Sequence, residues 1–224
     1  KSLLIKDVPH ILKKRDFGGE ACAAMYLRRL GRPVDQDYVF DCSGLDPMLA
    51  RGCYTKELAT ALVKFGFRPG AVFYRVPAAE AGRHLASHWQ ALHKDLAAGV
   101  PSIVCMRRAP APDASEGFRL VLGCDAKTDE VIYHDPDVAR GAYRRMKRAD
   151  FLARWPLKSD PKLWTVIRLR LEPGQLRAGR AAETFTAADY AQHMMTLRKK
   201  LPRKGFTVII QHPFVVIGDE PPQM

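Results

Sequence analysis

Apolar residues in the first part of the chain recur at helical spacing. Within residues 19–30, Ala23, Tyr26, Leu27 and Leu30 form an i, i+3, i+4, i+7 stripe, which predicts an amphipathic helix. Similar patterns, with turn residues between them, predict three more helices. They cover residues 35–42, residues 55–66 with Thr55 as the cap, and residues 80–98.

Beyond residue 100 the pattern changes to short runs of strand-forming residues. The turn 125–129 should join two of them in a hairpin. We expect strands at residues 71–76, 101–107, 118–124, 130–134, 142–146 and 163–171, and a short helix at 149–155. Helices followed by an antiparallel sheet predict an α+β fold.

The last fifty residues read differently. Residues 173–183 resemble a linker, Thr186 should cap a helix over 187–201, and residues 206–218 should form one strand. We therefore expect a main domain at 1–172 and a segment at 173–224 that begins a further domain of a longer protein. The start at Lys1, without Met, is consistent with a processed or trimmed chain.

The composition suits one domain of ordinary size with an extra lobe. The chain has 224 residues, 47% of them hydrophobic, so it can bury a core without metals or disulfides. Lys and Arg outnumber Asp and Glu by 36 to 24, which gives a net charge of +12. This favours anionic partners, although a solvated basic surface is the simpler interpretation. We expect no nucleic acid, because no motif accompanies the charge, and no run reaches the roughly 18 apolar residues of a membrane span.

One stretch concentrates the positive charge. It could bind an anionic partner, although its aromatic residues suit core positions better than a binding face. The basic residues are Arg140, Arg144, Arg145, Lys147 and Arg148.

The cysteines and histidines do not form a metal-binding pattern. Cys42 and Cys53 could close a loop by a disulfide, which would favour a secreted or periplasmic protein, or they could be free buried thiols. His84 and His88 share a helix face, but no third ligand is evident. We therefore predict no metal and no cofactor, and the compartment otherwise stays open.

Three stretches match, in order and spacing, motifs of one peptidase family. They are GGEACAAM (18–25) against CGxAxxxM, LAAGVPSIVCMRR (96–108) against a small-Gly-Pro-apolar strand entry, and GFRLVLGCDAKTDEVIYHDPDV (117–138) against HFxxxxG…DP. Residues 8–172 thereby resemble the papain-like cysteine peptidases, and among them the bacteriocin-processing family. The resemblance implies a papain-like fold. That family cuts leader peptides after a double glycine and is often fused to ABC exporters.

The same alignment implies that catalysis is lost. The nucleophilic Cys falls on Gly18, the general-base His on Gly117, and the oxyanion-hole Gln on Leu12 or Lys13. The orienting Asp is retained as Asp135. A thiol peptidase needs a thiolate, a base and oxyanion donors, and glycine supplies none of them.

An active enzyme would need other residues. Cys22 lies one helical turn inside the first helix, where a packed core thiol is expected, and it could act only with His10 or His134 as its base. His134 should face away from the old site, because neighbouring strand residues point to opposite faces.

The resemblance therefore predicts a pseudopeptidase that binds a peptide or partner protein in the old cleft. Degenerate domains of this kind in exporter systems hold a substrate without cutting it. The binding positions would be Lys13, Gly18, Gly19, Gly117 and Asp135. The two glycines should leave the cleft roomier, and Lys13 and Lys14 should favour acidic segments. The alternatives are a thiol peptidase that uses Cys22 and a purely structural module of a longer multidomain protein.

Overall fold

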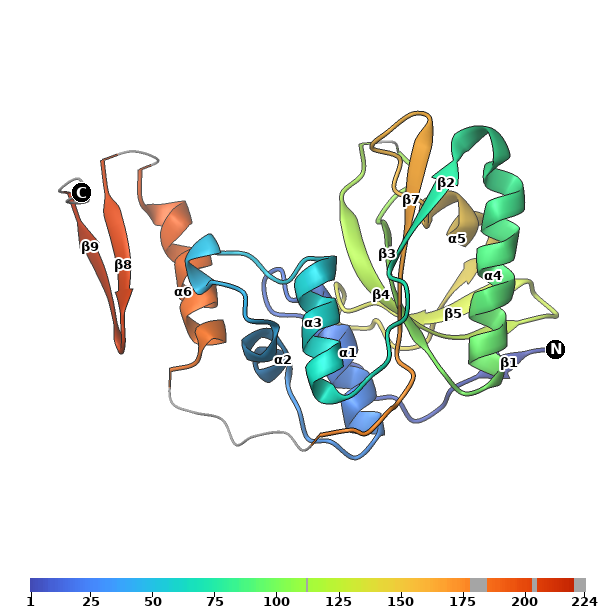
Figure 1. The fold of residues 1–224 in the computed structure, drawn as a ribbon, viewed down its shortest axis with the longest axis horizontal. Helices are drawn as coiled ribbons and strands as arrows, with labels where there is room; N and C mark the ends of the chain where they lie inside the picture. The colour runs from blue at the N-terminus through green and yellow to red at the C-terminus, as the bar shows by residue number, and fades with distance from the viewer. Residues whose placement is uncertain (112, 178–184, 203–204, 220–224) are drawn as a thin grey trace.

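The computed structural model describes residues 1–111, 113–177, 185–202 and 205–219. The chain has an α+β fold in which N-terminal helices pack on an antiparallel sheet, so the predicted class is confirmed (Figure 1). Within the described residues, no helix is long and apolar enough to cross a membrane.

Three helices and a 3-10 turn form the N-terminal layer. They are α1 (Gly18–Arg29), α2 (Gln36–Ser43), η1 (Pro47–Leu49) and α3 (Thr55–Phe65). Asp35 caps α2 by accepting a hydrogen bond from the Tyr38 backbone N–H at 2.9 Å. The predicted cap of α3 is wrong by one residue, because Tyr54 is the cap and Thr55 is the first helical residue. Gly66, in the left-handed region at φ 91°, ends α3.

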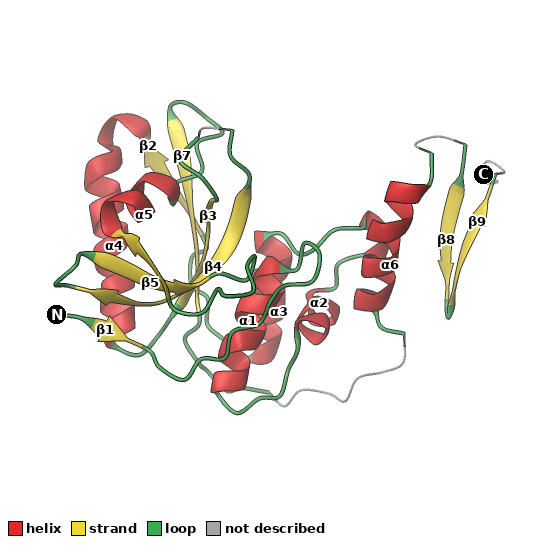
Figure 2. Cartoon of the chain, turned by 180° about the vertical axis from the view of Figure 1, so that it is seen from behind, coloured by secondary structure: helices red, strands yellow, loops and turns green. Residues whose placement is uncertain are grey.

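The main sheet is antiparallel, with the strand order β2-β7-β3-β4-β5-β6 and β1 beside β4 (Figure 2). Its strands are β1 (Leu3–Leu4), β2 (Phe73–Pro77), β3 (Ser102–Arg107), β4 (Glu116–Asp125), β5 (Glu130–His134), β6 (Arg144–Lys147) and β7 (Leu163–Arg170). The six strands predicted between residues 71 and 171 all exist with boundaries shifted by a few residues, whereas β1 and η1 were not predicted.

The two faces of the sheet carry separate cores. In β3, Ile103 and Cys105 pack with the N-terminal helices, while Val104 and Met106 pack on the opposite face. That opposite face is covered by α4 (Ala81–Ala97) and α5 (Arg148–Arg154), with the short turn η2 (Ala78–Glu80) before α4. Figure 1 shows α4 and α5 on the side of the sheet away from α1 and α3.

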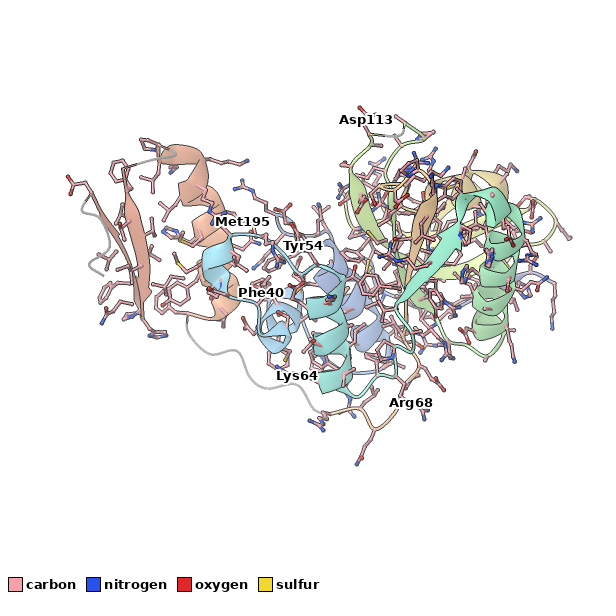
Figure 3. The ribbon with its side chains drawn as sticks, turned by 45° about the horizontal axis from the view of Figure 1, so that its top comes forward. Phe40, Tyr54, Lys64, Arg68, Asp113 and Met195 are labelled. Atoms are coloured by element: carbon pink, nitrogen blue, oxygen red, sulfur yellow. The ribbon has the colours of Figure 1, made fainter. Side chains whose placement is uncertain are left out.

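Helix α6 (Ala187–Lys200) joins the N-terminal helical layer. Thr186 caps it, as predicted, and the Asp41 carboxylate accepts a hydrogen bond from the Ala188 backbone at 2.8 Å. Met195 on α6 and Phe40 on α2 belong to the same core (Figure 3). The division into 1–172 and 173–224 stays a prediction, and residues 178–183 of the expected linker lie outside the described residues.

The single strand predicted over 206–218 is wrong. The segment forms a hairpin of β8 (Thr207–Gln211) and β9 (Phe214–Gly218), because the chain turns at His212 and Pro213. Proline has no N–H to donate to a ladder, which favours a break there. Among the described residues this two-stranded sheet pairs only with itself.

Candidate functional site

A cavity of about 480 Å³ lies between the helical layer and the sheet. The first residue of α1, Gly18, lines it, as do Lys13 before that helix and Gly117 on β4. The positions that the alignment assigns to the nucleophile and the base, and one of its two candidates for the oxyanion donor, therefore surround one cavity, although up to about a hundred residues separate them in sequence. The other candidate, Leu12, is exposed and does not line the cavity. The other two expected binding residues, Gly19 and Asp135, are buried and do not line the cavity.

The floor of the cavity is a row of side chains across three strands. Ile167 on β7 is opposite Cys105 on β3, and Cys105 is opposite Phe118 on β4. Tyr54, at the start of α3, adds an exposed aromatic ring on the helical side. In Figure 3, Tyr54 lies on the helical layer and Asp113 lies at the tip of the loop that joins β3 and β4.

Gly18, which the alignment assigns to the nucleophile, has open space around it. A Cβ atom placed on Gly18 would lie 3.8 Å from Cδ of Lys13 and 3.9 Å from Cβ of Phe118, which are ordinary contact distances. The same atom on Gly19 would lie 2.5 Å from Cδ2 of Leu58, so Gly19 is a close-packing position. The fold could therefore accept a side chain at Gly18. At Gly19 a side chain would require Leu58 to move.

The space beside Gly117, which the alignment assigns to the general base, is occupied by another side chain. A Cβ atom on Gly117 would lie 2.9 Å from Nη2 of Arg108 and 3.0 Å from its Cζ. Nε of Arg108 in turn donates to Oδ2 of Asp137 at 2.6 Å, and Nη1 donates to Ser115 at 3.1 Å. The expectation of a roomier cleft is therefore wrong at Gly117, because a guanidinium group fills the space beside it.

Asp137 is the carboxylate at the centre of this cluster. It forms ion pairs with Lys13 at 2.8 Å, Arg108 at 2.6 Å and Arg119 at 3.1 Å. Burial alone would raise its pKa, but the hydrogen bonds from Arg108 and Lys13 hold that pKa well below its ordinary value. Asp135, which the alignment assigns to the orienting Asp, pairs with Nε of Arg119 at 3.2 Å and accepts the Asp137 backbone N–H at 2.9 Å.

Neither a protein-family model nor a curated protein matches this sequence. Among solved structures, the chain is similar to the peptidase domain of Streptococcus ComA, described as a bi-functional ABC transporter involved in a quorum-sensing pathway. The TM-score is 0.46 at 16% sequence identity, over 73% of this chain and 98% of that domain. The likeness concerns the course of the chain and gives no information about activity.

The thiols near the site are buried. Cys22 is fully buried and does not line the cavity, and burial raises its pKa. Cys105 lies on the cavity floor, where burial raises its pKa to about 12. Cys42 and Cys53 are both free, so the disulfide is not formed and supplies no argument for export.

The two candidate bases also lie outside the cavity lining. His134 is completely buried against Tyr143, with ring centroids 4.4 Å apart, and burial lowers its pKa to about 4. A ring nitrogen of His10 lies 2.8 Å from the backbone oxygen of Asp135. Among the described residues, neither the His10 ring nor the His134 ring forms a hydrogen bond with Cys22.

The other expected sites are more ordinary. Arg145, Lys147 and Arg148 form ion pairs with neighbouring acidic residues, which leaves Arg140 and Arg144 without a partner among the described residues. An anionic partner there stays a prediction. The described part of the chain holds no group of three or more potential metal ligands, and His84 instead lies 3.8 Å from Glu80.

Sequence reasoning missed the residues that fill the site. Arg108 and Asp137 were not singled out, and neither carries a motif signal of its own. The signal that existed was indirect: Asp137 comes two residues after the aligned Asp135, and Arg108 begins the loop that ends at Gly117.

Proposed function

We propose that this chain is a peptidase-like domain without catalytic activity that binds a peptide, or an extended segment of a partner protein, in the cavity. One observation carries the proposal. Gly18 and Gly117, which one alignment assigns to the nucleophile and the base, line the same cavity together with Lys13, and neither glycine supplies the required catalytic group.

The cavity lacks the chemistry of a thiol peptidase. Gly18 has no nucleophile, and the group that stands beside Gly117 is a guanidinium, which stays protonated and cannot act as a base. Cys105 is on the cavity floor, but at a pKa of about 12 it is a thiol rather than a thiolate at neutral pH. Lys13 could still donate hydrogen bonds to a backbone carbonyl, which suits binding.

The cavity has the properties of a binding site. Its volume of about 480 Å³ is within the range of roughly 300–1,000 Å³ typical of ligand pockets. An apolar floor and a polar rim are the usual combination in such sites, because apolar contact gives affinity and polar groups fix orientation. A peptide supplies both kinds of group along one extended chain.

An array of short synthetic peptides of varied sequence tests the proposal. We expect the protein to bind a subset of the array and to leave every peptide intact by mass spectrometry. Gly18→Phe should abolish binding, because the new ring would enter the cavity from an open position. Gly82→Phe is the matched control, since Gly82 is an exposed helical glycine with open space around it and lies outside the cavity lining.

Three results would contradict the proposal. Peptide cleavage that is lost in Cys22→Ala or Cys105→Ala would show an active thiol peptidase. Binding that survives Gly18→Phe would place the ligand elsewhere, and no binding to any peptide would leave the cavity without a peptide-binding role.

A further inference from the structure

The positive charges at the cavity already have partners. Lys13 pairs with Asp137 at 2.8 Å, and Arg108 pairs with the same carboxylate. Arg51 pairs with Glu57 at 2.9 Å and lies over the Tyr54 ring at 3.9 Å. A ligand carboxylate would have to compete with these protein carboxylates for the same donors.

Two acidic side chains at the cavity have no such partner. Asp16 and Glu116 both line it, both are exposed, and within the described residues neither side chain forms an ion pair or a hydrogen bond. They come from different elements, since Asp16 precedes α1 and Glu116 begins β4. Partial burial raises the pKa of Glu116.

We infer that the cavity selects a peptide segment that carries a Lys or Arg next to an apolar side chain, with the cation paired to Glu116 and Asp16 at the rim. The inference rests on the proposed function and names the class of ligand. The apolar side chain lies on the floor formed by Ile167, Cys105 and Phe118. Charge complementarity decides the sign of the ligand, because the unpaired charges at the cavity are negative.

This assignment replaces the expectation that Lys13 and Lys14 attract acidic segments. Lys13 is paired with Asp137, and Lys14 is paired with Asp37. The net charge of +12 on the whole chain does not reverse the assignment, because salt at physiological strength screens interactions beyond about 8 Å. The charges within a few ångströms of the ligand therefore outweigh the distant surface.

The test uses array peptides in triplets that differ at one position. Each triplet carries Lys, Gln or Glu beside a central Leu, with both termini blocked so that they add no charge. We expect the Lys version to bind about tenfold more tightly than the Gln version, the size of two solvent-exposed ion pairs, and the Glu version to bind most weakly.

Variants at Glu116 and Asp16 test whether these two residues cause the preference for Lys. Glu116→Gln should reduce the preference for Lys over Gln severalfold, and adding Asp16→Asn should remove it. Asp113→Asn is the matched control, because Asp113 is an exposed acid in the same β3–β4 loop outside the cavity lining, and it should keep the preference (Figure 3).

The outcomes separate this inference from the proposed function. Equal binding of the three versions, or preference for Glu, together with loss of binding in Gly18→Phe, would overturn the charge assignment and leave the proposed function standing. Preference for Lys that survives the double variant would also overturn it. Absence of binding by any peptide would overturn both.

Discussion

Arg108 occupies the space into which a side chain at Gly117 would extend, since a Cβ atom there would lie 2.9 Å from Nη2 of Arg108. The position of the aligned base is thus filled by a cation that bonds to Asp137. The space beside Gly117 is therefore filled, and the bond between Arg108 and Asp137 ties the β3–β4 loop to the segment after β5.

This arrangement predicts coupling between positions 108 and 117. Gly117→Ala should destabilise the fold by about 1 kcal/mol, because the new Cβ displaces the guanidinium from Asp137. In an Arg108→Ala background, Gly117→Ala should lower the free energy of unfolding clearly less, because the effects of residues in contact are not additive. Denaturant unfolding of the four proteins of the cycle measures this, and additive effects would contradict the predicted displacement.

Asp137 should make stability depend on acid pH. Its pKa is lower in the folded protein, so its stabilising contribution is fully present above its ordinary pKa of about 3.9 and is lost as the pH falls toward the folded value. Asp137→Asn should therefore be destabilised near neutral pH, and its difference from the wild type should shrink in acid. Unfolding free energies across this range test the prediction, and a difference from the wild type that stays constant with pH would contradict it.

Glu20 should make the stability of the fold change with pH in the opposite direction. It is fully buried on α1, where burial raises its pKa to about 7, and its Oε1 accepts the Cys53 backbone N–H at 2.6 Å. Between its ordinary pKa of about 4.3 and about 7, the folded protein holds a proton that the unfolded chain has released, so stability falls as the pH rises.

Glu20→Gln keeps an acceptor for that N–H and removes the titration. The variant should therefore gain stability relative to the wild type as the pH rises through this range. Thermal unfolding at several pH values measures the trend, and a difference that is constant with pH would show that Glu20 is charged in the folded protein.

Thiol labelling should follow burial. Cys22 has no exposed surface and a raised pKa, so we expect it to stay unlabelled by an alkylating reagent in the folded protein, whereas half-buried Cys42 should react first. Mass spectrometry of digested samples measures both sites. Rapid labelling of Cys22 below its ordinary pKa of roughly 8.5 would indicate an activated thiolate and would favour the enzyme alternative.

Much of the fold could be predicted from local pattern. The amphipathic stripe before Gly31, the Thr186 cap and the hairpin at 125–129 are local signals, so their elements appear where expected. The C-terminal hairpin was missed because the strand-forming residues on both sides of Pro213 read as one run. β1 was missed because two residues carry too little periodicity to detect.

The sequence by itself determined the α+β order of elements and the absence of side chains at Gly18 and Gly117, because both depend on residue type and local spacing. Only the tertiary structure decided which charges are paired. Lys13 and Arg108 meet Asp137 across more than a hundred and nearly thirty residues of chain, respectively, and an ion pair depends on distances of a few ångströms. That pairing leaves Asp16 and Glu116 unpaired at the cavity, so the net charge of the chain could not reveal the sign of the unpaired charges there.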